Sequence, residues 1–295
     1  MVKPLKIVSI SAEVAPFSKS GGLGDVCRSL PKAIKRLGHE VIAITPLYGK
    51  VIDTKLHELE MIYENVEIYL NSQDKVSVNY WKGYLMKGLP IYFVECKKYF
   101  SKHKKLYGSG HENVRFLIFD VAALKLISLL KYEADIVHCH DWHTGLIPFY
   151  LKTDFRYSKT LRKAKTIFTI HNLAFQLGQN WWEISPEKRD NGKKRIPHID
   201  DPEIEYINFA KRAIRTADAV NTVSEQYREE IMTKNFGQDL ERILRNREDR
   251  LFGIINGIDH KQYNPMLDHG LHEIFNFKKI HRKKSNKTFI QKKFG

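Results

Sequence analysis

Hydrophobic residues occur along the chain in two alternating patterns. Short runs rich in Ile and Val predict buried strands, and apolar residues at every third or fourth position predict helices. The predicted strands cover residues 5–11, 41–45, 136–139, 166–170, 219–223 and 251–255. The predicted helices cover residues 26–37, 114–130, 145–152, 204–216 and 225–233. Because strands and helices alternate, the sequence predicts an α/β fold with a doubly wound, Rossmann-like parallel sheet.

Three segments refine this prediction. Alternating apolar and polar positions within residues 57–95 predict an antiparallel excursion or hairpin. The helix over 114–130 is expected to have its apolar side chains on one face. Residues 177–203 are rich in Trp, Lys, Arg and Asp and are expected to form a long loop, in which Trp181 and Trp182 either contact a ligand or anchor the loop.

Composition excludes several classes of protein. The chain has 295 residues, of which 42% are hydrophobic and 28% charged, which argues against disorder and against a fibre. No apolar run approaches the roughly 18–20 residues of a membrane span, and residues 1–16 lack a secretory cleavage site. The three cysteines Cys27, Cys96 and Cys139 are far apart, which excludes a disulfide framework or a zinc ribbon. We therefore expect a cytoplasmic location, or a plastid one if the source is a plant or alga, and no membrane partner.

The formal net charge of +15 is concentrated near the end of the chain. Residues 278–293 contain eight Lys or Arg residues and no acid. The segment has no known nucleic-acid motif, so we interpret it as a solvated basic tail and expect no nucleic-acid partner. An anionic substrate would also suit such a charge.

Unusual residues gather where the predicted strands end. In a doubly wound sheet, ligands bind at the carboxyl ends of the strands, so clusters at these ends are expected to converge on one site. Five clusters stand in such positions: residues 13–25, 138–143, 171–176, 222–224 and 256–259.

The first cluster contains the glycine-rich segment from Lys19 to Asp25. Glycines between a strand and a helix allow backbone N–H groups to approach a phosphate, and the helix dipole favours the anion. The Walker pattern fails because no Gly-Lys-Ser/Thr follows, and the Rossmann fingerprint fails because Cys27 stands where its third glycine belongs. The alternative interpretation is a tight turn that requires glycine.

The second cluster suggests a metal site. His138 and His140 share one face of a strand, and Asp141 and His143 could complete a set of ligands. The zincin pattern His-Glu-x-x-His is absent, so we prefer structural histidines at 138 and 140 and expect no metal.

The motifs together resemble a known family. Ser-Ala-Glu-Val-Ala-Pro-Phe-Ser-Lys-Ser-Gly-Gly-Leu-Gly-Asp-Val at 11–26 is similar to the amino-terminal signature of bacterial glycogen synthases and plant starch synthases. The resemblance continues in family order through His-Cys-His-Asp-Trp-His-Thr-Gly at 138–145, Thr-Ile-His-Asn-Leu-Ala-Phe-Gln at 169–176, Asn-Thr-Val-Ser at 221–224 and Gly-Ile-Ile-Asn-Gly-Ile-Asp at 253–259. It spans residues 5–265.

This resemblance implies a GT-B glycosyltransferase that transfers glucose from ADP-glucose to the non-reducing end of an α-1,4-glucan, glycogen or starch, with retention and without a metal or other cofactor. Carried over by motif, Lys19 and the amide of Gly22 would meet the phosphates of the donor. His171 would contact the transferred glucose, and Asn256 would line the donor side of the cleft.

Four further positions follow from the same resemblance. Asp25 and Asp141 would hold sugar hydroxyls, Trp142 would offer an apolar face to the glucan, and Glu13 matches an acidic position near the site. His171, Asp25 and Glu13 are thus the candidate catalytic residues. A retaining transfer builds negative charge on the departing phosphate, so cations and helix N-termini nearby are stabilising.

The resemblance also has limits. Ser20 stands where the family usually has Thr, and Phe175 where it has Tyr. We expect residues 1–265 to be the amino-terminal catalytic domain and residues 266–295 to be a linker and the start of a second domain. The adenine pocket and diphosphate clamp of the family would then come from a carboxyl-terminal half, which a separate gene could encode. A glucan-binding remnant without turnover and a different GT-B enzyme are the alternative functions.

Overall fold

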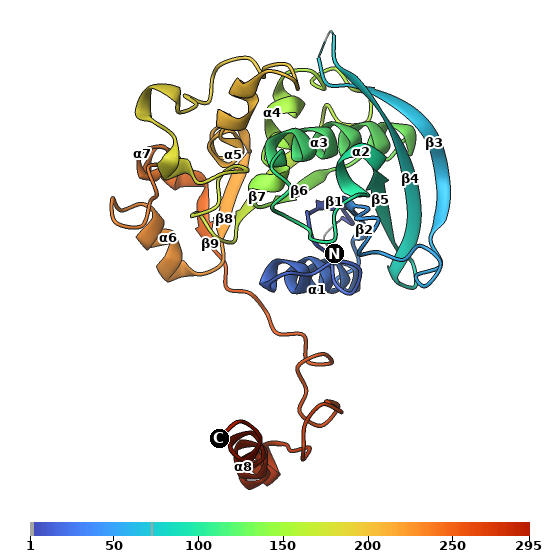
Figure 1. Cartoon of the computed structure of the whole chain (residues 1–295), viewed down its shortest axis with the longest axis vertical. Coiled ribbons are helices and arrows are strands. Elements are labelled where there is room, and N and C mark those ends of the chain that lie inside the picture. The colour runs from blue at the N-terminus through green and yellow to red at the C-terminus, as the bar shows by residue number, and fades with distance from the viewer. Residues whose placement is uncertain (1–2, 72) are drawn as a thin grey trace. The chain divides into compact units, whose positions relative to one another are not determined.

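The computed structural model describes residues 3–71 and 73–295, and its strands form one nine-stranded sheet (Figure 1). The strands are β1 (Lys6–Ile10), β2 (Glu40–Pro46), β3 (Glu60–Tyr69), β4 (Lys75–Met86), β5 (Leu89–Glu95), β6 (Ile136–His140), β7 (Lys165–Ile170), β8 (Ala219–Thr222) and β9 (Leu251–Gly253). Their order is β3-β4-β5-β2-β1-β6-β7-β8-β9, and all neighbours from β5 to β9 are parallel. The predicted α/β fold with a parallel sheet is confirmed.

The strand order places a topological switch point between β1 and β6. From β1 the chain passes to β2, then to the edge strand β3 and back through β4 to β5, and finally to the other side of β1 at β6. In doubly wound sheets, connections that diverge in this way leave a crevice at the carboxyl ends of the two strands, where ligands bind.

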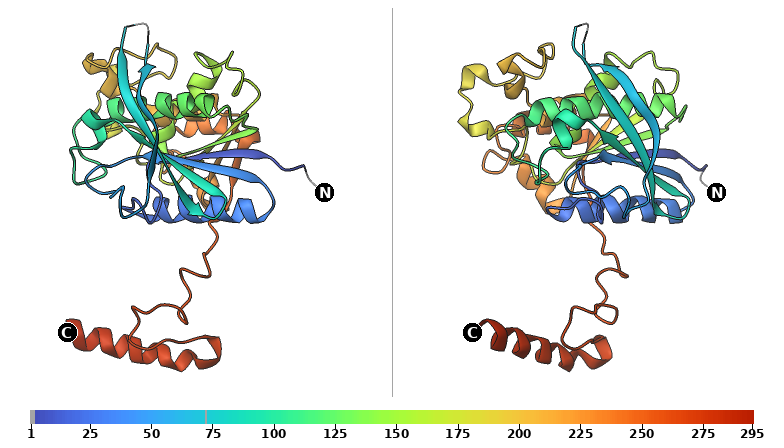
Figure 2. Two further views of the ribbon diagram at one scale, coloured as in Figure 1. Left: turned by 90° about the vertical axis from the view of Figure 1, so that its right-hand side faces the viewer. Right: turned by 45° about the vertical axis from the view of Figure 1, so that its right-hand side comes forward.

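Helices cover both faces of the sheet. They are α1 (Gly22–Arg36), α2 (Lys97–Phe100), α3 (Glu112–Leu129), α4 (Ile147–Lys152), α5 (Phe209–Thr216), α6 (Glu225–Ile231) and α7 (Glu241–Arg245). Figure 2 shows α1 on one face and α3 on the opposite face. Helix α1 ends before Gly38, whose φ of 93° is the left-handed conformation that suits glycine after a helix.

Helix α3 differs from its prediction. The helix itself is confirmed, at Glu112–Leu129 for a prediction of 114–130, but all of its residues except Lys125, Ser128 and Leu129 are buried, so apolar burial is not confined to one face. The helix contacts β3, β4 and β5 on one side and α4 with the short turns at 142–144 and 202–206 on the other. Its buried polar residues are paired: Arg115 Nη1 lies 2.7 Å from Glu112 Oε1, and Asp120 Oδ2 accepts a hydrogen bond from Leu146 N at 2.9 Å.

The excursion over 57–95 is confirmed, and one predicted helix is broken. Strands β3 and β4 pair antiparallel, as do β4 and β5. The helix predicted over 204–216 is a 3₁₀ turn at Pro202–Tyr206 followed, after extended residues, by α5. The break follows from Asn208, whose side chain accepts a hydrogen bond from Lys211 N at 2.8 Å and caps the new helix.

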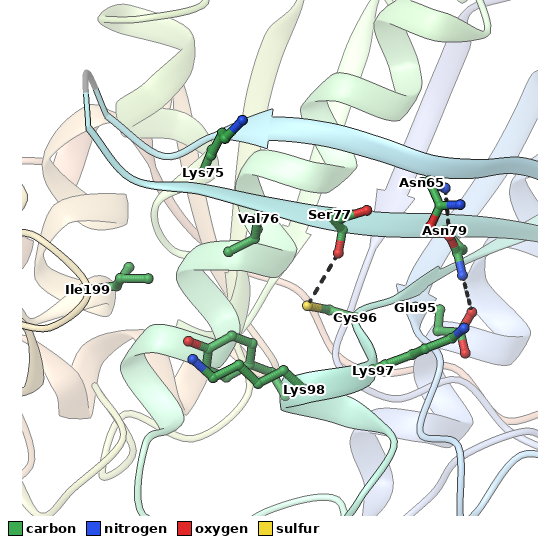
Figure 3. A pocket seen from close by; sticks show the side chains of 11 residues that line it. Asn65, Lys75, Val76, Ser77, Asn79, Glu95, Cys96, Lys97, Lys98 and Ile199 are labelled. Carbon is green, nitrogen blue, oxygen red and sulfur yellow. Dashed lines mark hydrogen bonds between the residues drawn. The ribbon is translucent and has the colours of Figure 1, made fainter.

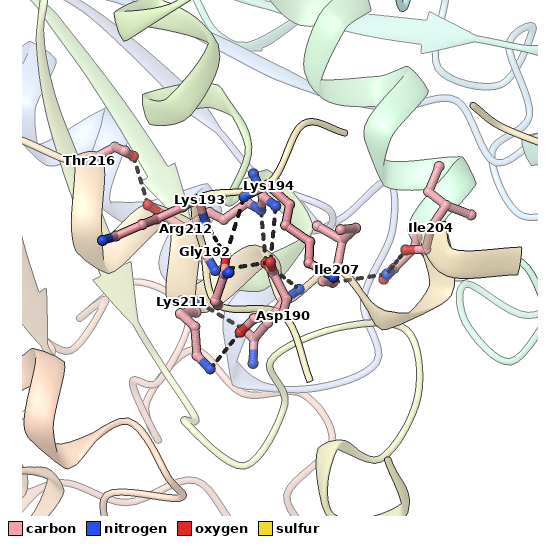
Figure 4. Close-up of polar contacts among 12 residues, drawn as sticks. Asp190, Gly192, Lys193, Lys194, Ile204, Ile207, Lys211, Arg212 and Thr216 are labelled. Atoms are coloured by element: carbon pink, nitrogen blue, oxygen red, sulfur yellow. Dashed lines mark hydrogen bonds and ion pairs between the residues drawn. The ribbon is translucent and has the colours of Figure 1, made fainter. Parts of the chain in front are cut away.

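A buried ion pair fastens the long loop over 177–203 (Figure 4). Arg212 of α5 donates from Nε to Asp190 Oδ2 at 2.9 Å and from Nη2 to Asp190 Oδ1 at 3.0 Å, and neither side chain is exposed. Trp181 donates to Gln238 Oε1 at 3.3 Å, whereas the Trp182 side chain is exposed. Of the two interpretations of these tryptophans, loop anchoring thus describes Trp181.

The chain divides into two compact units, one ending at Ile255 and one covering Asn256–Gly295. The second unit contains a 3₁₀ segment, Phe277–Arg282, and α8 (Lys283–Phe294), which carries most of the basic residues of 278–293. Asn286 joins its parts by donating to Glu273 O at 2.7 Å and accepting from Glu273 N at 3.1 Å. The expected domain boundary at 265 stays a prediction.

Two further observations concern the cysteines and the length of the helices. All three cysteines are buried, and none of them forms a disulfide. Across 3–71 and 73–295, none of the helices has the length and apolar character required to cross a membrane.

Candidate active site

Two of the five strand-end clusters are joined by hydrogen bonds beside the switch point. The backbone N–H of Asp141, just after β6, donates to Thr169 O of β7 at 2.9 Å. The Asp141 carboxylate in turn accepts from the backbone N–H of His171 at 2.7 Å. The segment after β1 holds Glu13 and the glycine-rich loop, beside β6 in the sheet. In the fourth cluster, the side chain of Ser224 caps the start of α6. Asn256, in the fifth cluster, belongs to the second unit, and its role on the donor side stays a prediction.

The glycines of the loop divide into two kinds. A Cβ built on Gly21 or Gly22 meets no atom within 4 Å, and neither residue has a left-handed φ. A Cβ on Gly24 would lie 3.1 Å from Ser18 O and 3.2 Å from Lys19 Cβ. The tight-turn interpretation therefore fits only Gly24, for close packing. Gly21 and Gly22 leave the backbone open on the side where a Cβ would lie, at the N-terminus of a 15-residue helix, which is where an anion is favoured. The N–H of Gly21 itself donates to Glu13 Oε2 at 3.4 Å.

Lys19 and Asp25 form an ion pair beside this open backbone. Lys19 Nζ lies 2.7 Å from Asp25 Oδ2, and the two side chains are 45% and 16% exposed. The structure thus brings together two of the predicted site residues. An ion pair this exposed contributes little to the stability of the fold. The ammonium can therefore be redirected to a ligand at small cost.

The Glu13 carboxylate holds the glycine-rich loop in place through hydrogen bonds. Its buried carboxylate accepts hydrogen bonds from Ser20 N at 2.5 Å, from Ser20 Oγ at 2.6 Å and from Tyr107 Oη at 2.6 Å. Burial, with the nearby carboxylates, raises the pKa of Tyr107 well above its ordinary value, so its hydroxyl stays protonated and donates. The sequence analysis missed Tyr107, because its contact with Glu13 joins residues 94 positions apart.

An aromatic stack stands beside Glu13. The His143 ring lies between Trp142, at 4.2 Å between centroids, and Tyr107, at 4.8 Å. Trp142 also packs against Phe116 and is only 5% exposed. This packing is that of a core side chain rather than an open face, so a glucan contact for Trp142 stays a prediction. Burial, with Arg115 nearby, lowers the pKa of His143 to about 3 and keeps the ring neutral.

The histidines of the metal hypothesis have other partners. His138 Nε2 lies 2.6 Å from Thr169 Oγ1, and burial lowers the pKa of His138 to about 3. His143 is part of the aromatic stack, and Asp141 accepts from the backbone of β7's end. Within the part of the chain that the structure describes, no group of three or more His, Cys, Asp or Glu side chains is arranged to hold a metal ion.

The backbone at Asp141 is in an unusual conformation. Its φ of 58° and ψ of 174° lie in a region that glycine adopts easily and other residues rarely. Such a conformation costs on the order of 1–3 kcal/mol and persists only where surrounding contacts impose it. Here both the N–H and the carboxylate of Asp141 are bound to β7 and its end, which turns the chain sharply at the crevice.

A separate hollow lies on the antiparallel excursion (Figure 3). Its volume is about 420 Å³, and its lining includes Lys75, Lys97 and Lys98. Its central polar groups satisfy one another, because Asn79 donates to Glu95 Oε2 at 2.8 Å and accepts from Asn65 N. The hollow adjoins β5, which β2 separates from the switch point.

The fold and site define a class of protein: an α/β domain with a glycine-rich helix N-terminus, a lysine and carboxylates near the switch point of a parallel sheet. Comparison with known proteins identifies the family. The family model described as "Starch synthase catalytic domain" matches residues 6–246, and the chain belongs to this family.

Individual relatives agree with this assignment. The chain is 35% identical to the glycogen synthase of Geotalea daltonii and 36% identical to that of Streptococcus gordonii, covering 99% of this chain and 60% of each relative. Among solved structures it resembles the "Catalytic domain of Starch Synthase IV from Arabidopsis thaliana bound to ADP and acarbose", with a TM-score of 0.82, 31% identity and coverage of 99% of this chain and 60% of that one. The chain thus spans about 60% of the length of these relatives.

Proposed function

We propose that this chain forms the part of a glycogen or starch synthase that binds both substrates at the switch point of its sheet. The proposed reaction transfers glucose from ADP-glucose to the non-reducing end of an α-1,4-glucan with retention of configuration. The observation that carries the proposal is the open backbone of Gly21 and Gly22 at the start of α1, beside the Lys19 ammonium.

The donor side of the site follows from electrostatics. Negative charge grows on the departing diphosphate as the bond to glucose breaks. The amide of Gly22, the N-terminus of α1 and Lys19 would oppose that charge. The first two are fixed by the helix, whereas Lys19 would turn from Asp25 toward the phosphate. Preorganised groups of this kind lower the barrier because they need no reorientation during the reaction.

The sugar side rests on the end of β7. His171 would contact the transferred glucose, and Asp141 and Asp25 would hold sugar hydroxyls. Burial raises the pKa of Asp141, and His171 opposes that rise. Asp141 would act from one carboxylate oxygen, since Oδ1 already accepts from His171 N. Glu13 would act by fixing the loop through Ser20.

Support from the relatives is of two kinds. The curated relatives are named glycogen synthases, and the Arabidopsis structure is described as bound to ADP and acarbose, a nucleotide and an oligosaccharide mimic. We extend these ligand classes to this chain as part of the proposal. We also propose that complete activity requires the portion of the relatives that this chain does not cover, on the same or a separate polypeptide.

The test is incorporation of labelled glucose from ADP-glucose into glycogen, with UDP-glucose as the competing donor. The chain is assayed alone and together with the carboxyl-terminal portion of the Geotalea daltonii relative, the portion to which this chain does not align. Transfer that prefers ADP-glucose supports the proposal. Binding of glycogen without transfer under both conditions would favour the alternative, a glucan-binding protein without turnover.

A further inference from the structure

The side chain of His140 contacts the proposed catalytic histidine rather than the crevice. His140 is fully buried on β6, and its Nδ1 lies 3.1 Å from Nε2 of His171. The two rings are 5.4 Å apart between centroids and are inclined by 39°. Because His171 N also binds Asp141, His171 is held both at its backbone and at its ring.

The second nitrogen of His140 faces the neighbouring strand. Its Nε2 lies 3.5 Å from Oγ of the buried Ser9 on β1. Burial lowers the pKa of His140 well below its ordinary value, so the ring is neutral and carries one N–H and one lone pair. Nδ1 of His140 and Nε2 of His171 then share a single proton, which belongs to one ring or the other. In both cases the Ser9 hydroxyl can pair with Nε2 of His140, because it can donate or accept.

The adjacent histidine is fixed in a different way. Thr169 Oγ1 donates to Asn221 Oδ1 at 2.7 Å, so its lone pair must accept from Nε2–H of His138 at 2.6 Å. The His138 ring lies 4.0 Å from the His140 ring, between centroids. His140 therefore packs against a neighbour with a fixed tautomer, and its own freedom to rotate is small.

We propose that His140, supported by Ser9, is a positioning residue that holds the His171 ring in one orientation, with Nδ1 directed to the substrate. The inference rests on the proposed function for the role of His171, but the contacts that carry it lie within this chain. Substrate oxygens would then meet one defined ring nitrogen rather than a ring that samples several orientations.

The first test measures imidazole nitrogen signals by nuclear magnetic resonance on the isotopically labelled 295-residue chain without ligand. We expect the two ring nitrogens of His171 to give distinct, sharp signals, as for a ring held in one orientation. The variant His140→Phe keeps an aromatic ring but removes Nδ1, so the two His171 nitrogens should become averaged. The variant His140→Asn places an amide near the position of Nδ1 and should restore much of the difference. His138→Gln, on the same face of β6, is the matched control and should leave His171 unchanged.

The second test uses the transfer assay with both portions present. His140→Phe should lower kcat by roughly 10- to 100-fold, as misorientation of a reacting group does, with KM for ADP-glucose changed less than about threefold. His140→Asn should recover part of kcat.

A His171 spectrum that is already averaged in the parent chain, or unchanged in both His140 variants, overturns the proposal. If the His140→Phe chain does not fold, the spectra of His140→Asn and Ser9→Ala test the proposal instead. Loss of the Ser9 hydroxyl should alter the His140 signals. Failure of ADP-glucose transfer by the parent protein would refute the proposed function and leave the spectroscopic result standing.

Discussion

Replacing Gly22 by Ala separates the two interpretations of the glycine-rich loop. A Cβ at Gly22 meets no atom within 4 Å, and the residue begins α1 with helical geometry. The fold should therefore accept Ala, and reduced freedom of the unfolded chain should stabilise it by at most about 0.5–1 kcal/mol. A loop that needs glycine only for its turn would not behave in this way.

The same methyl group would stand where a phosphate must approach the backbone. A displacement of the donor by about 1 Å can reduce the rate roughly 100-fold, which corresponds to about 2.7 kcal/mol in the barrier. The transfer assay with ADP-glucose and glycogen should show this loss in kcat/KM. Urea unfolding of the same variant should show an unchanged or slightly raised midpoint.

Gly24→Ala is the matched control in the same loop. Its Cβ would lie 3.1 Å from Ser18 O, a backbone atom, so this variant should lose stability as well as activity. Transfer by the Gly22→Ala protein within about twofold of the parent would refute the phosphate assignment. So would a loss of transfer that a drop in the unfolding midpoint fully explains.

Three further predictions concern neighbouring residues. Lys19→Ala should lower the transfer rate by roughly 30- to 1,000-fold, on the order of 2–4 kcal/mol in the barrier, because one cation opposing the developing charge is lost. Lys19→Arg should recover part of that rate. The melting temperature should change little, because the ion pair with Asp25 is exposed. Glu13→Gln should reduce the free energy of unfolding by about 1–3 kcal/mol, measured with urea, because the charged acceptor of Ser20 and Tyr107 is lost. His143 has a folded pKa of about 3, below its ordinary value of 6.5, so its contribution to stability is complete above pH 6.5 and is lost as the pH falls toward 3; His143→Phe should reduce the dependence of unfolding free energy on pH between 6.5 and 5 by about 1.4 kcal/mol per pH unit.

Each of these has a clear contrary result. Near-normal transfer by the Lys19→Ala protein would make the residue an ordinary surface lysine. If Glu13→Gln unfolds at the parental urea concentration, the carboxylate does not hold the loop. An unchanged acid profile in His143→Phe would show that other buried groups control acid unfolding.

The strands could be predicted from the sequence because parallel strands buried on both faces form continuous apolar runs. This pattern located β1, β2 and β6 to within a residue or two at each end. It located α3 but not the burial of all its sides, because a helix that is covered all round has no polar face to set off an apolar one. It failed near Asn208, where a single side-chain cap divides an otherwise helical pattern.

The types of residue in the site were predictable, but most of their contacts were not. Lys19 and Asp25 are close in sequence, and their ion pair spans the start of one helix. The bonds from Tyr107 to Glu13 and from His140 to His171 join residues 94 and 31 positions apart. Such contacts depend on the order of strands in the sheet, which the hydrophobic pattern does not specify.

The switch point keeps its geometry at a cost in stability. A glycine at position 141 would adopt the observed φ and ψ without strain, whereas Asp141 costs on the order of 1–3 kcal/mol there. The Asp141 side chain gives something that glycine cannot, since its carboxylate fixes the backbone of His171. Gly145, a few residues later, has the opposite reason for its identity: a Cβ there would lie 2.5 Å from Phe209 O, so glycine is needed for packing alone. One short motif thus combines a strained residue whose carboxylate fixes the backbone of His171 with a glycine whose size is set by packing, and only the three-dimensional contacts tell them apart.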